Sequence, residues 1–194
     1  MMATLYHIQD SFDEEEGIRS VHAAFAAGIN FFDTSPYYGA LRSEQVLGRA
    51  LQGLPRNKVV LSTKVGRYGP EQQHFDFSAA RVTASVQESL QRLQTDYIDI
   101  IQCHDIEFGD LDQVVSETLP ALVRLRDQGI VRHIGITGLP LGIFPYVLDR
   151  YGVVPCSPVS LLLCEVVGFL SHRWSQGASW HCGRGALLLP RVPA

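Results

Sequence analysis

The sequence is poor in lysine and cysteine and has no long apolar run. Its 16 basic residues include only two lysines, Lys58 and Lys64, so chemistry that needs a lysine must use one of them. None of its four cysteines forms a Cys-x-x-Cys pair, which argues against a disulfide framework and a zinc site. The longest apolar stretch, residues 159–170, contains Glu165 and is shorter than the roughly 20 residues that a membrane-spanning helix needs. We therefore expect neither structural zinc nor a membrane span.

The charge pattern excludes further classes of protein. A net charge of −4 does not suit a general binder of nucleic acid or of anionic membranes. Residues 1–17 are acidic and lack the apolar segment of a secretory signal. We expect a cytoplasmic protein with no nucleic-acid or membrane partner. Near the other end, four metal-ligating residues are spaced too irregularly for a metal site: Cys156, Cys164, His181 and Cys182.

Several common catalytic and nucleotide-binding motifs are also absent. The sequence has no Gly-x-Gly-x-x-Gly, no Gly-Lys-Ser/Thr phosphate loop, no His-Glu-x-x-His and no Gly-x-Ser-x-Gly. The residues four positions before the two lysines are Leu54 and Val60, so the Tyr-x-x-x-Lys pair of short-chain dehydrogenases is missing. The chemistry must therefore come from residues that lie apart in the sequence.

Apolar strands and amphipathic helices alternate up to about residue 152. Continuous apolar segments predict strands at 29–33, 59–64, 97–104 and 131–137, with starts about 30 to 39 residues apart. The helices between them are expected to begin at caps such as Asp13, Ser43 and Ser78, with a bend at Pro120. This pattern predicts parallel strands that are adjacent in chain order and covered by helices on one face.

Two architectures fit this alternation, a doubly wound sheet and a (β/α)8 barrel. The missing Gly-x-Gly-x-x-Gly argues against the first, so the barrel fits better. Eight units of about 34 residues need roughly 270 residues. The fold class predicted for this chain is therefore α/β, a partial (β/α)8 TIM barrel of about four to five units. Such a partial barrel leaves unpaired apolar edges near 29–33 and 131–137.

The end of the chain differs in character from the rest. Residues 1–155 carry a net charge of −6, whereas residues 156–194 carry +2, both tryptophans and no clear period. We expect a divergent segment at 1–13, the partial barrel at 14–152 and an unrelated, poorly structured tail at 153–194. A splice variant or a shifted reading frame would produce such a tail.

A hydrogen-bonding residue lies at the end of each predicted strand: Asp33, Lys64, His104 and Thr137. In a parallel barrel these ends meet at one rim, where active sites lie. Tyr38 follows on the loop after Asp33 and can return to that rim. Because an adjacent ammonium favours the phenolate, Lys64 held by Asp33 makes Tyr38 a candidate acid–base. His104 can hydrogen-bond the same substrate oxygen.

Each of these residues alone also has an ordinary structural interpretation. Asp33 suits a turn before Pro36, Lys64 a solvated strand end, and His104 a structural histidine with its hydrogen bonds satisfied. Residues 66–69 favour a flexible rim loop over a phosphate cradle. The coincidence of four such groups at matched strand ends is what favours a catalytic set.

Three segments of the sequence resemble the aldo-keto reductase family. These are residues 30–39 (Asn-Phe-Phe-Asp-Thr-Ser-Pro-Tyr-Tyr-Gly), residues 62–64 (Ser-Thr-Lys) and residues 96–104, which end in His104. Residues 75–78, 103–109 and 135–140 resemble, within that family, dehydrogenases that oxidise an aldose to its lactone. Those enzymes are (β/α)8 barrels that transfer hydride between a nicotinamide cofactor and a carbonyl or alcohol.

The resemblance implies a catalytic tetrad of Asp33, Tyr38, Lys64 and His104. It also implies nicotinamide contacts from Asp33, Thr137 and Gly138, with NAD as the cofactor and NADP as the alternative, and a sugar as the substrate. Two function classes stay open: this oxidoreductase, or a truncated, non-catalytic product that associates with another chain through its open sheet edges.

Overall fold

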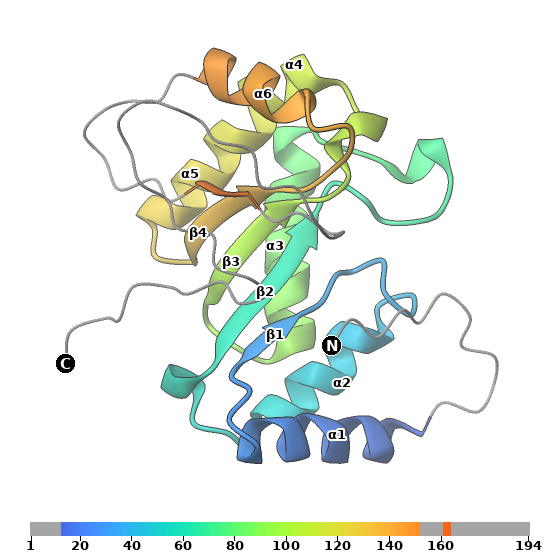
Figure 1. Cartoon of the computed structure of the whole chain (residues 1–194), viewed down its shortest axis with the longest axis vertical. Coiled ribbons are helices and arrows are strands. Elements are labelled where there is room, and N and C mark those ends of the chain that lie inside the picture. Colours follow the sequence, from blue (N-terminus) through green and yellow to red (C-terminus); the bar gives the residue numbers. More distant parts are fainter. Residues whose placement is uncertain (1–12, 152–160, 164–194) are drawn as a thin grey trace.

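The computed structural model describes residues 13–151 and 161–163, which form a parallel β-sheet flanked by helices. Its five strands are hydrogen-bonded in chain order, β1-β2-β3-β4-β5 (Figure 1). They are β1 (Phe31–Asp33), β2 (Val60–Val65), β3 (Ile98–Cys103), β4 (Val131–Ile136) and β5 (Leu161–Leu163). Every neighbouring pair is parallel, so the predicted strand order and direction are confirmed.

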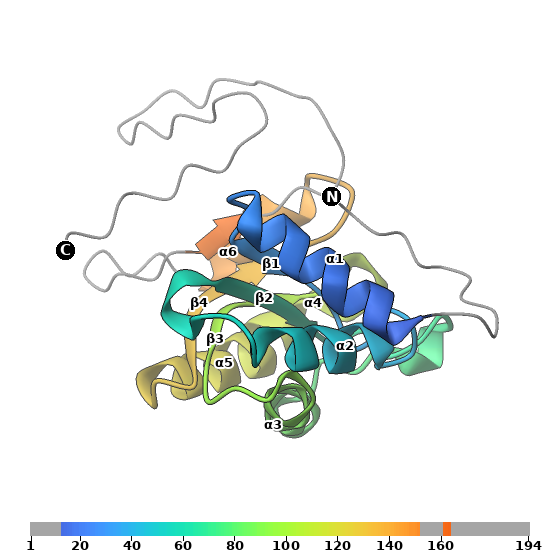
Figure 2. The ribbon, with the colours of Figure 1, turned by 90° about the horizontal axis from the view of Figure 1, so that it is seen from below.

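Helices alternate with these strands, as the periodicity predicts. The longer ones are α1 (Glu14–Ala26), α2 (Arg42–Leu51), α3 (Ala79–Leu93), α5 (Leu119–Asp127) and α6 (Ile143–Tyr151). A short helix α4 (Leu111–Gln113) continues through a π-helical turn (Val114–Thr118) into α5. Figure 2 shows α3 and α5 on the same side of the sheet. The alternating outward side chains of the strands are therefore buried beneath helices.

Two of the three predicted helix caps are confirmed. Asp13 accepts hydrogen bonds from the first-turn amides of α1, and Ser78 accepts one from the Arg81 amide in α3. The prediction for Ser43 is wrong, because α2 begins one residue earlier and Leu41 occupies the cap position. The Ser43 hydroxyl instead lies 2.8 Å from the Thr34 hydroxyl, where it ties α2 to the loop after β1.

The helix predicted to bend at Pro120 has an irregular turn just before that residue. This is the π-helical turn at residues 114–118, and Pro120 lies in the first turn of α5 that follows it. Proline has no amide hydrogen to donate within a helix, so the regular α-helical hydrogen bonding is interrupted beside it. The irregularity therefore lies next to Pro120, as the sequence predicts.

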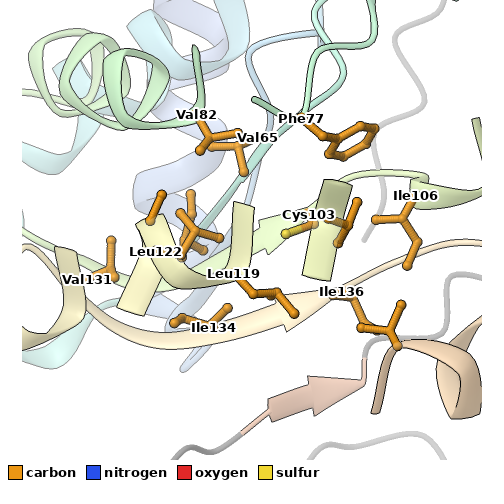
Figure 3. Packing of buried hydrophobic residues seen from close by; sticks show 14 of the residues in the cluster. Val65, Phe77, Val82, Cys103, Ile106, Leu119, Leu122, Val131, Ile134 and Ile136 are labelled. Carbon is orange, nitrogen blue, oxygen red and sulfur yellow. The ribbon is translucent and has the colours of Figure 1, made fainter. Parts of the chain in front are cut away.

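The larger apolar core lies between the sheet and α3, α5 and α6. Figure 3 shows the outward side chains of β3 and β4 packed beneath α3 and α5. A smaller cluster joins α2 to the start of β2 through Leu47, Leu51 and Leu61. Full burial of one such side chain stabilises a fold by about 1.5–3 kcal/mol. Cys103 belongs to the larger core, and burial raises the pKa of its thiol to about 12.

β5 corrects one expectation about the sheet edges. It lies within the segment predicted to be a poorly structured tail, and Leu161 aligns with Ile134 of β4. The predicted open edge at residues 131–137 is therefore paired at Ile134–Ile136. The rest of the predicted tail, including Cys156, Cys164, His181 and Cys182, and residues 1–12 lie outside the described residues.

Within residues 13–151 and 161–163, no helix combines the length and apolar character that crossing a bilayer requires. In the same part of the chain, no group of three or more His, Cys, Asp or Glu side chains is arranged to hold a metal ion.

Gly48 permits a close approach of α2 to the end of α3. A Cβ at this position would lie 2.2 Å from the Arg92 carbonyl oxygen and 2.8 Å from backbone atoms of Leu93. We expect Gly48→Ala to lower the free energy of unfolding by about 1–3 kcal/mol, because backbone cannot yield as a flexible side chain can. Urea unfolding should show this loss, and Gly142→Ala is the matched control because a Cβ there meets nothing within 4 Å. Equal stability of the two variants would contradict this packing.

Candidate active site

The Lys64 ammonium is buried and paired at the carboxyl end of β2. Its Nζ donates to Asp33 Oδ2 at 2.5 Å and to the Thr34 carbonyl oxygen at 2.8 Å, and the residue is only 1% exposed. The Ser62 hydroxyl donates to the other carboxylate oxygen of Asp33 at 2.9 Å. Because β1 and β2 align Asp33 with Ser62, parallel pairing itself brings these groups together.

Tyr38 completes the arrangement from the loop between β1 and α2. The Lys64 Nζ lies 4.8 Å from the centroid of the Tyr38 ring. The centroid of the His104 ring lies 5.7 Å from that of the Tyr38 ring, and the two rings are at 85° to each other. The Lys64 ammonium is thus close to both the Asp33 carboxylate and the Tyr38 ring. All four residues predicted as the catalytic tetrad meet at one end of the sheet.

His104 is held just past the end of β3. Its amide donates to the Val65 carbonyl oxygen at 2.8 Å, and its Nδ1 lies 3.4 Å from the Ser35 hydroxyl. Burial, with the charges of Lys64 and Arg67 as smaller contributions, lowers the pKa of His104 to about 2. The imidazole is therefore neutral at physiological pH and acts as a hydrogen-bonding group.

Two residues that follow β4, Thr137 and Gly138, are predicted to contact a nicotinamide. In the structure both pack against other residues at the same end of the sheet. The Thr137 hydroxyl accepts from the Asp105 amide at 3.1 Å and donates to the Cys103 carbonyl oxygen at 3.4 Å. Gly138 has φ +157°, and a Cβ there would lie 2.2 Å from Glu107 Oε2. Asp33, in contrast, keeps its carboxylate partly exposed. The cofactor role of Thr137 and Gly138 stays a prediction.

Other polar residues at this rim are not singled out by the sequence pattern. Ser35 reaches His104, and Asp105 Oδ2 lies 3.5 Å from His104 Nε2. Arg67 Nη1 donates to Asp105 Oδ2 at 2.5 Å, and its guanidinium lies 4.2 Å above the Tyr37 ring. The loop at residues 66–69, predicted to be flexible, thus contributes a cation that its contacts hold in place. The sequence gives one indication of these additional residues, which is that Asp105 directly follows His104.

Gln102 is a buried polar residue on the same face as His104. It aligns with Lys64 on one side and with Gly135 on the other. No hydrogen-bond partner of its side-chain oxygen or nitrogen is found among the described residues, although the residue is buried. Such an amide is unusual, because buried polar atoms in proteins are nearly always hydrogen-bonded.

Comparisons with known proteins agree with this geometry. The Aldo/keto reductase family profile matches residues 2–161, a range that extends beyond the expected 14–152 at both ends. L-galactose dehydrogenase of Arabidopsis thaliana is 57% identical over 152 residues, which are 77% of this chain and 46% of that protein. D-arabinose 1-dehydrogenase of Saccharomyces cerevisiae is 38% identical over 73% of this chain and 43% of its own length. The chain thus spans less than half the length of these relatives.

Two solved bacterial structures share this fold over the matched part. An aldo-keto reductase from Bacillus halodurans in its holo form has a TM-score of 0.64 at 36% identity, covering 74% of this chain and 48% of its own. An aldo/keto reductase from Klebsiella pneumoniae, in complex with NADP and acetate, has a TM-score of 0.64 at 28% identity. It covers 77% of this chain and 48% of its own. The α/β fold is therefore that of a partial TIM barrel. With the family profile matching most of its length, this chain belongs to the aldo/keto reductase family.

Proposed function

We propose that this chain carries the proton-transfer part of an NAD(P)-dependent aldose dehydrogenase. The observation that carries the proposal is the meeting of Asp33, Lys64, Tyr38 and His104 at one end of the sheet. The proposed reaction oxidises L-galactose to L-galactono-1,4-lactone, a step of ascorbate biosynthesis in the cytoplasm. The 57% identity to the Arabidopsis L-galactose dehydrogenase supports this substrate.

Tyr38 is the proposed acid–base. Its phenolate takes the proton of the C1 hydroxyl while hydride leaves the same carbon. The Lys64 ammonium, 4.8 Å from the ring centroid, stabilises the negative charge of the phenolate. The contacts from Asp33 and the Thr34 carbonyl hold that ammonium in place, so no reorganisation is needed during proton transfer.

His104 is proposed to orient the reacting oxygen. A hydroxyl hydrogen donated by Ser35 to Nδ1 leaves the proton of the neutral ring on Nε2. That Nε2–H can then donate to the C1 oxygen of the sugar. Because the ring is neutral, it fixes the position of the oxygen without competing with Tyr38 for the proton.

The nicotinamide cofactor supplies the hydride acceptor when it is bound. Asp33 fits its expected place beside the ring because its carboxylate is partly exposed at the rim. Thr137 and Gly138 would act indirectly, by holding the backbone at this end of the sheet in place for the cofactor. The Thr137 hydroxyl already has two backbone partners. We propose NAD, with NADP as the alternative supported by the bound cofactor of the Klebsiella relative.

The second candidate function is a non-catalytic chain that associates with another chain. It is favoured by β1, which pairs with β2 on one side and has no strand partner on the other within the described residues. Phe31 in β1 is 39% exposed, and Ile29 beside it is exposed as well. An open apolar strand edge readily pairs with another chain.

Tyr38→Phe tests the oxidoreductase. General acid–base catalysis contributes about 10²- to 10⁴-fold to a rate, so this variant should lose at least 100-fold of any L-galactose-dependent NADH formation. We expect the unmodified chain itself to turn over more than tenfold below the usual median of about 10 s⁻¹. The chain matches 46% of the Arabidopsis relative, and any cofactor contacts from the unmatched part would contribute through positioning, which is worth about 7–11 kcal/mol.

Steady-state absorbance assays on folded protein separate the outcomes. Turnover that survives Tyr38→Phe would refute the assigned acid–base. Turnover near the median that Tyr38→Phe abolishes would show that the chain holds the cofactor fully. No turnover at all would favour the non-catalytic candidate.

Phe31→Lys tests the association through β1. If the open edge pairs with another copy, sedimentation velocity should show a concentration-dependent dimer that the added charge reduces at least tenfold in affinity. Leu139→Lys, at another exposed apolar position, is the matched control and should leave the dimer intact. A monomer at all concentrations would rule this association out.

The neutral state of His104 also predicts a pH dependence of stability. In the folded chain His104 takes up no proton until about pH 2, whereas in the unfolded chain it does so below its ordinary pKa of 6.5. Protons therefore favour unfolding as the pH falls below 6.5, by up to about 1.4 kcal/mol per pH unit. Urea unfolding at pH 7 and 4.5 should show a smaller loss for His104→Gln than for the unmodified chain. The exposed His133→Gln should keep the original dependence, and equal losses in all three would disprove a neutral buried His104.

A further inference from the structure

A charged pair lies beside His104 and has no part in the proton transfer described above. Asp105 Oδ2 is 3.5 Å from His104 Nε2 and 2.5 Å from Arg67 Nη1. The Asp105 side chain is 23% exposed and that of Arg67 is 15% exposed, so both stay accessible from the rim. Asp105 Oδ2 therefore contacts the same imidazole nitrogen that is proposed to meet the reacting oxygen.

The backbone of Asp105 is in the left-handed region. Its φ is 52° and its ψ is 55°, values that aspartate and asparagine adopt more readily than other residues with a side chain. The Asp105 amide donates to the Thr137 hydroxyl at 3.1 Å, which fixes this conformation against the end of β4. This conformation directs the carboxylate toward His104 and Arg67.

Arg67 is equally constrained. Its guanidinium lies 4.2 Å from the Tyr37 ring centroid and 5.4 Å from that of Phe75. The loop that carries it is closed by hydrogen bonds from the Tyr68 amide to the His74 carbonyl and from the Asp76 amide to the Gly66 carbonyl. Little side-chain freedom remains to be lost when a ligand binds.

We propose that Asp105 and Arg67 recognise the hydroxyl on the carbon next to the reacting carbon of an aldose. This inference rests on the proposed function, because it assumes that the C1 oxygen lies at His104. The Asp105 carboxylate accepts the hydroxyl hydrogen, and the Arg67 guanidinium donates to the hydroxyl oxygen. The site therefore selects 2-hydroxylated aldoses over 2-deoxy sugars and simple carbonyl compounds.

Sugar binding, measured without turnover, tests this assignment. Ligand-observed NMR titrations would compare L-galactose with 2-deoxy-L-galactose on the unmodified chain, Asp105→Asn and the control Asp149→Asn. Asparagine keeps the shape of aspartate and tolerates the left-handed region, so Asp105→Asn should fold, which circular dichroism would verify. Asp149 is exposed on α6.

We expect the unmodified chain and Asp149→Asn to prefer L-galactose by at least tenfold, and Asp105→Asn to lose that preference. A preference that survives in Asp105→Asn, equal binding of both sugars, or no sugar binding by the folded chain would overturn the inference. Tyr38→Phe distinguishes it from the proposed function, because that variant should lose turnover yet keep the preference between the two sugars.

Discussion

Burial of the Lys64 ammonium is the constraint on which this end of the sheet depends. An unpaired ammonium in the interior would cost several kcal/mol, so the fold must supply fixed partners for it. Asp33 and the Thr34 carbonyl do so from the neighbouring strand end, and Ser62 orients the carboxylate. This requirement links the register of β1 and β2 to the placement of the loop that carries Tyr38.

The same ammonium adds to the effect of burial on the His104 ring. His104 lies where burial and two cations, Lys64 and Arg67, all oppose protonation of the ring. Asp105 forms an ion pair with Arg67 and so compensates the charge of one of these cations. The rim therefore combines a paired lysine, a neutral imidazole and a phenol within a few ångströms, which is an arrangement suited to moving a single proton without generating an isolated charge.

Much of the fold could be predicted from the spacing of apolar residues. Continuous apolar segments indicate buried parallel strands, and apolar residues at helical spacing indicate the helices that cover them. The strand ends Asp33, Lys64 and His104 could be placed together because the carboxyl ends of parallel strands converge. Ser43 could not be assigned correctly, since its hydroxyl is used in a contact with Thr34 that no local pattern reveals. The pairing of β5 with β4 is likewise not predictable, because three leucines in a segment without periodicity do not indicate a strand.

The rim residues beyond the predicted four depend on loop conformation. Ser35 and Asp105 contact His104 from loops, and Arg67 reaches Asp105 from the loop that begins at Gly66. The backbone angles of Asp105 and Gly66 are left-handed. Backbone angles of that kind follow from tertiary packing, such as the hydrogen bond between the Asp105 amide and Thr137. Strand periodicity therefore predicts the residues on the regular elements, and the loops supply what periodicity cannot.

The buried side chain of Gln102 has no hydrogen-bond partner among the described residues, so its place in the sheet contributes less stability than an apolar residue would. A buried amide without partners weakens a fold by about 1–3 kcal/mol, and an apolar side chain of similar volume would avoid that loss. Its neighbours in register are Lys64 and Gly135, neither of which offers an aliphatic side chain to pack against. This face of the sheet is therefore more polar and less stabilising than an aliphatic one would be. Replacing Gln102 with methionine or leucine is the first change to make when a more stable scaffold is wanted.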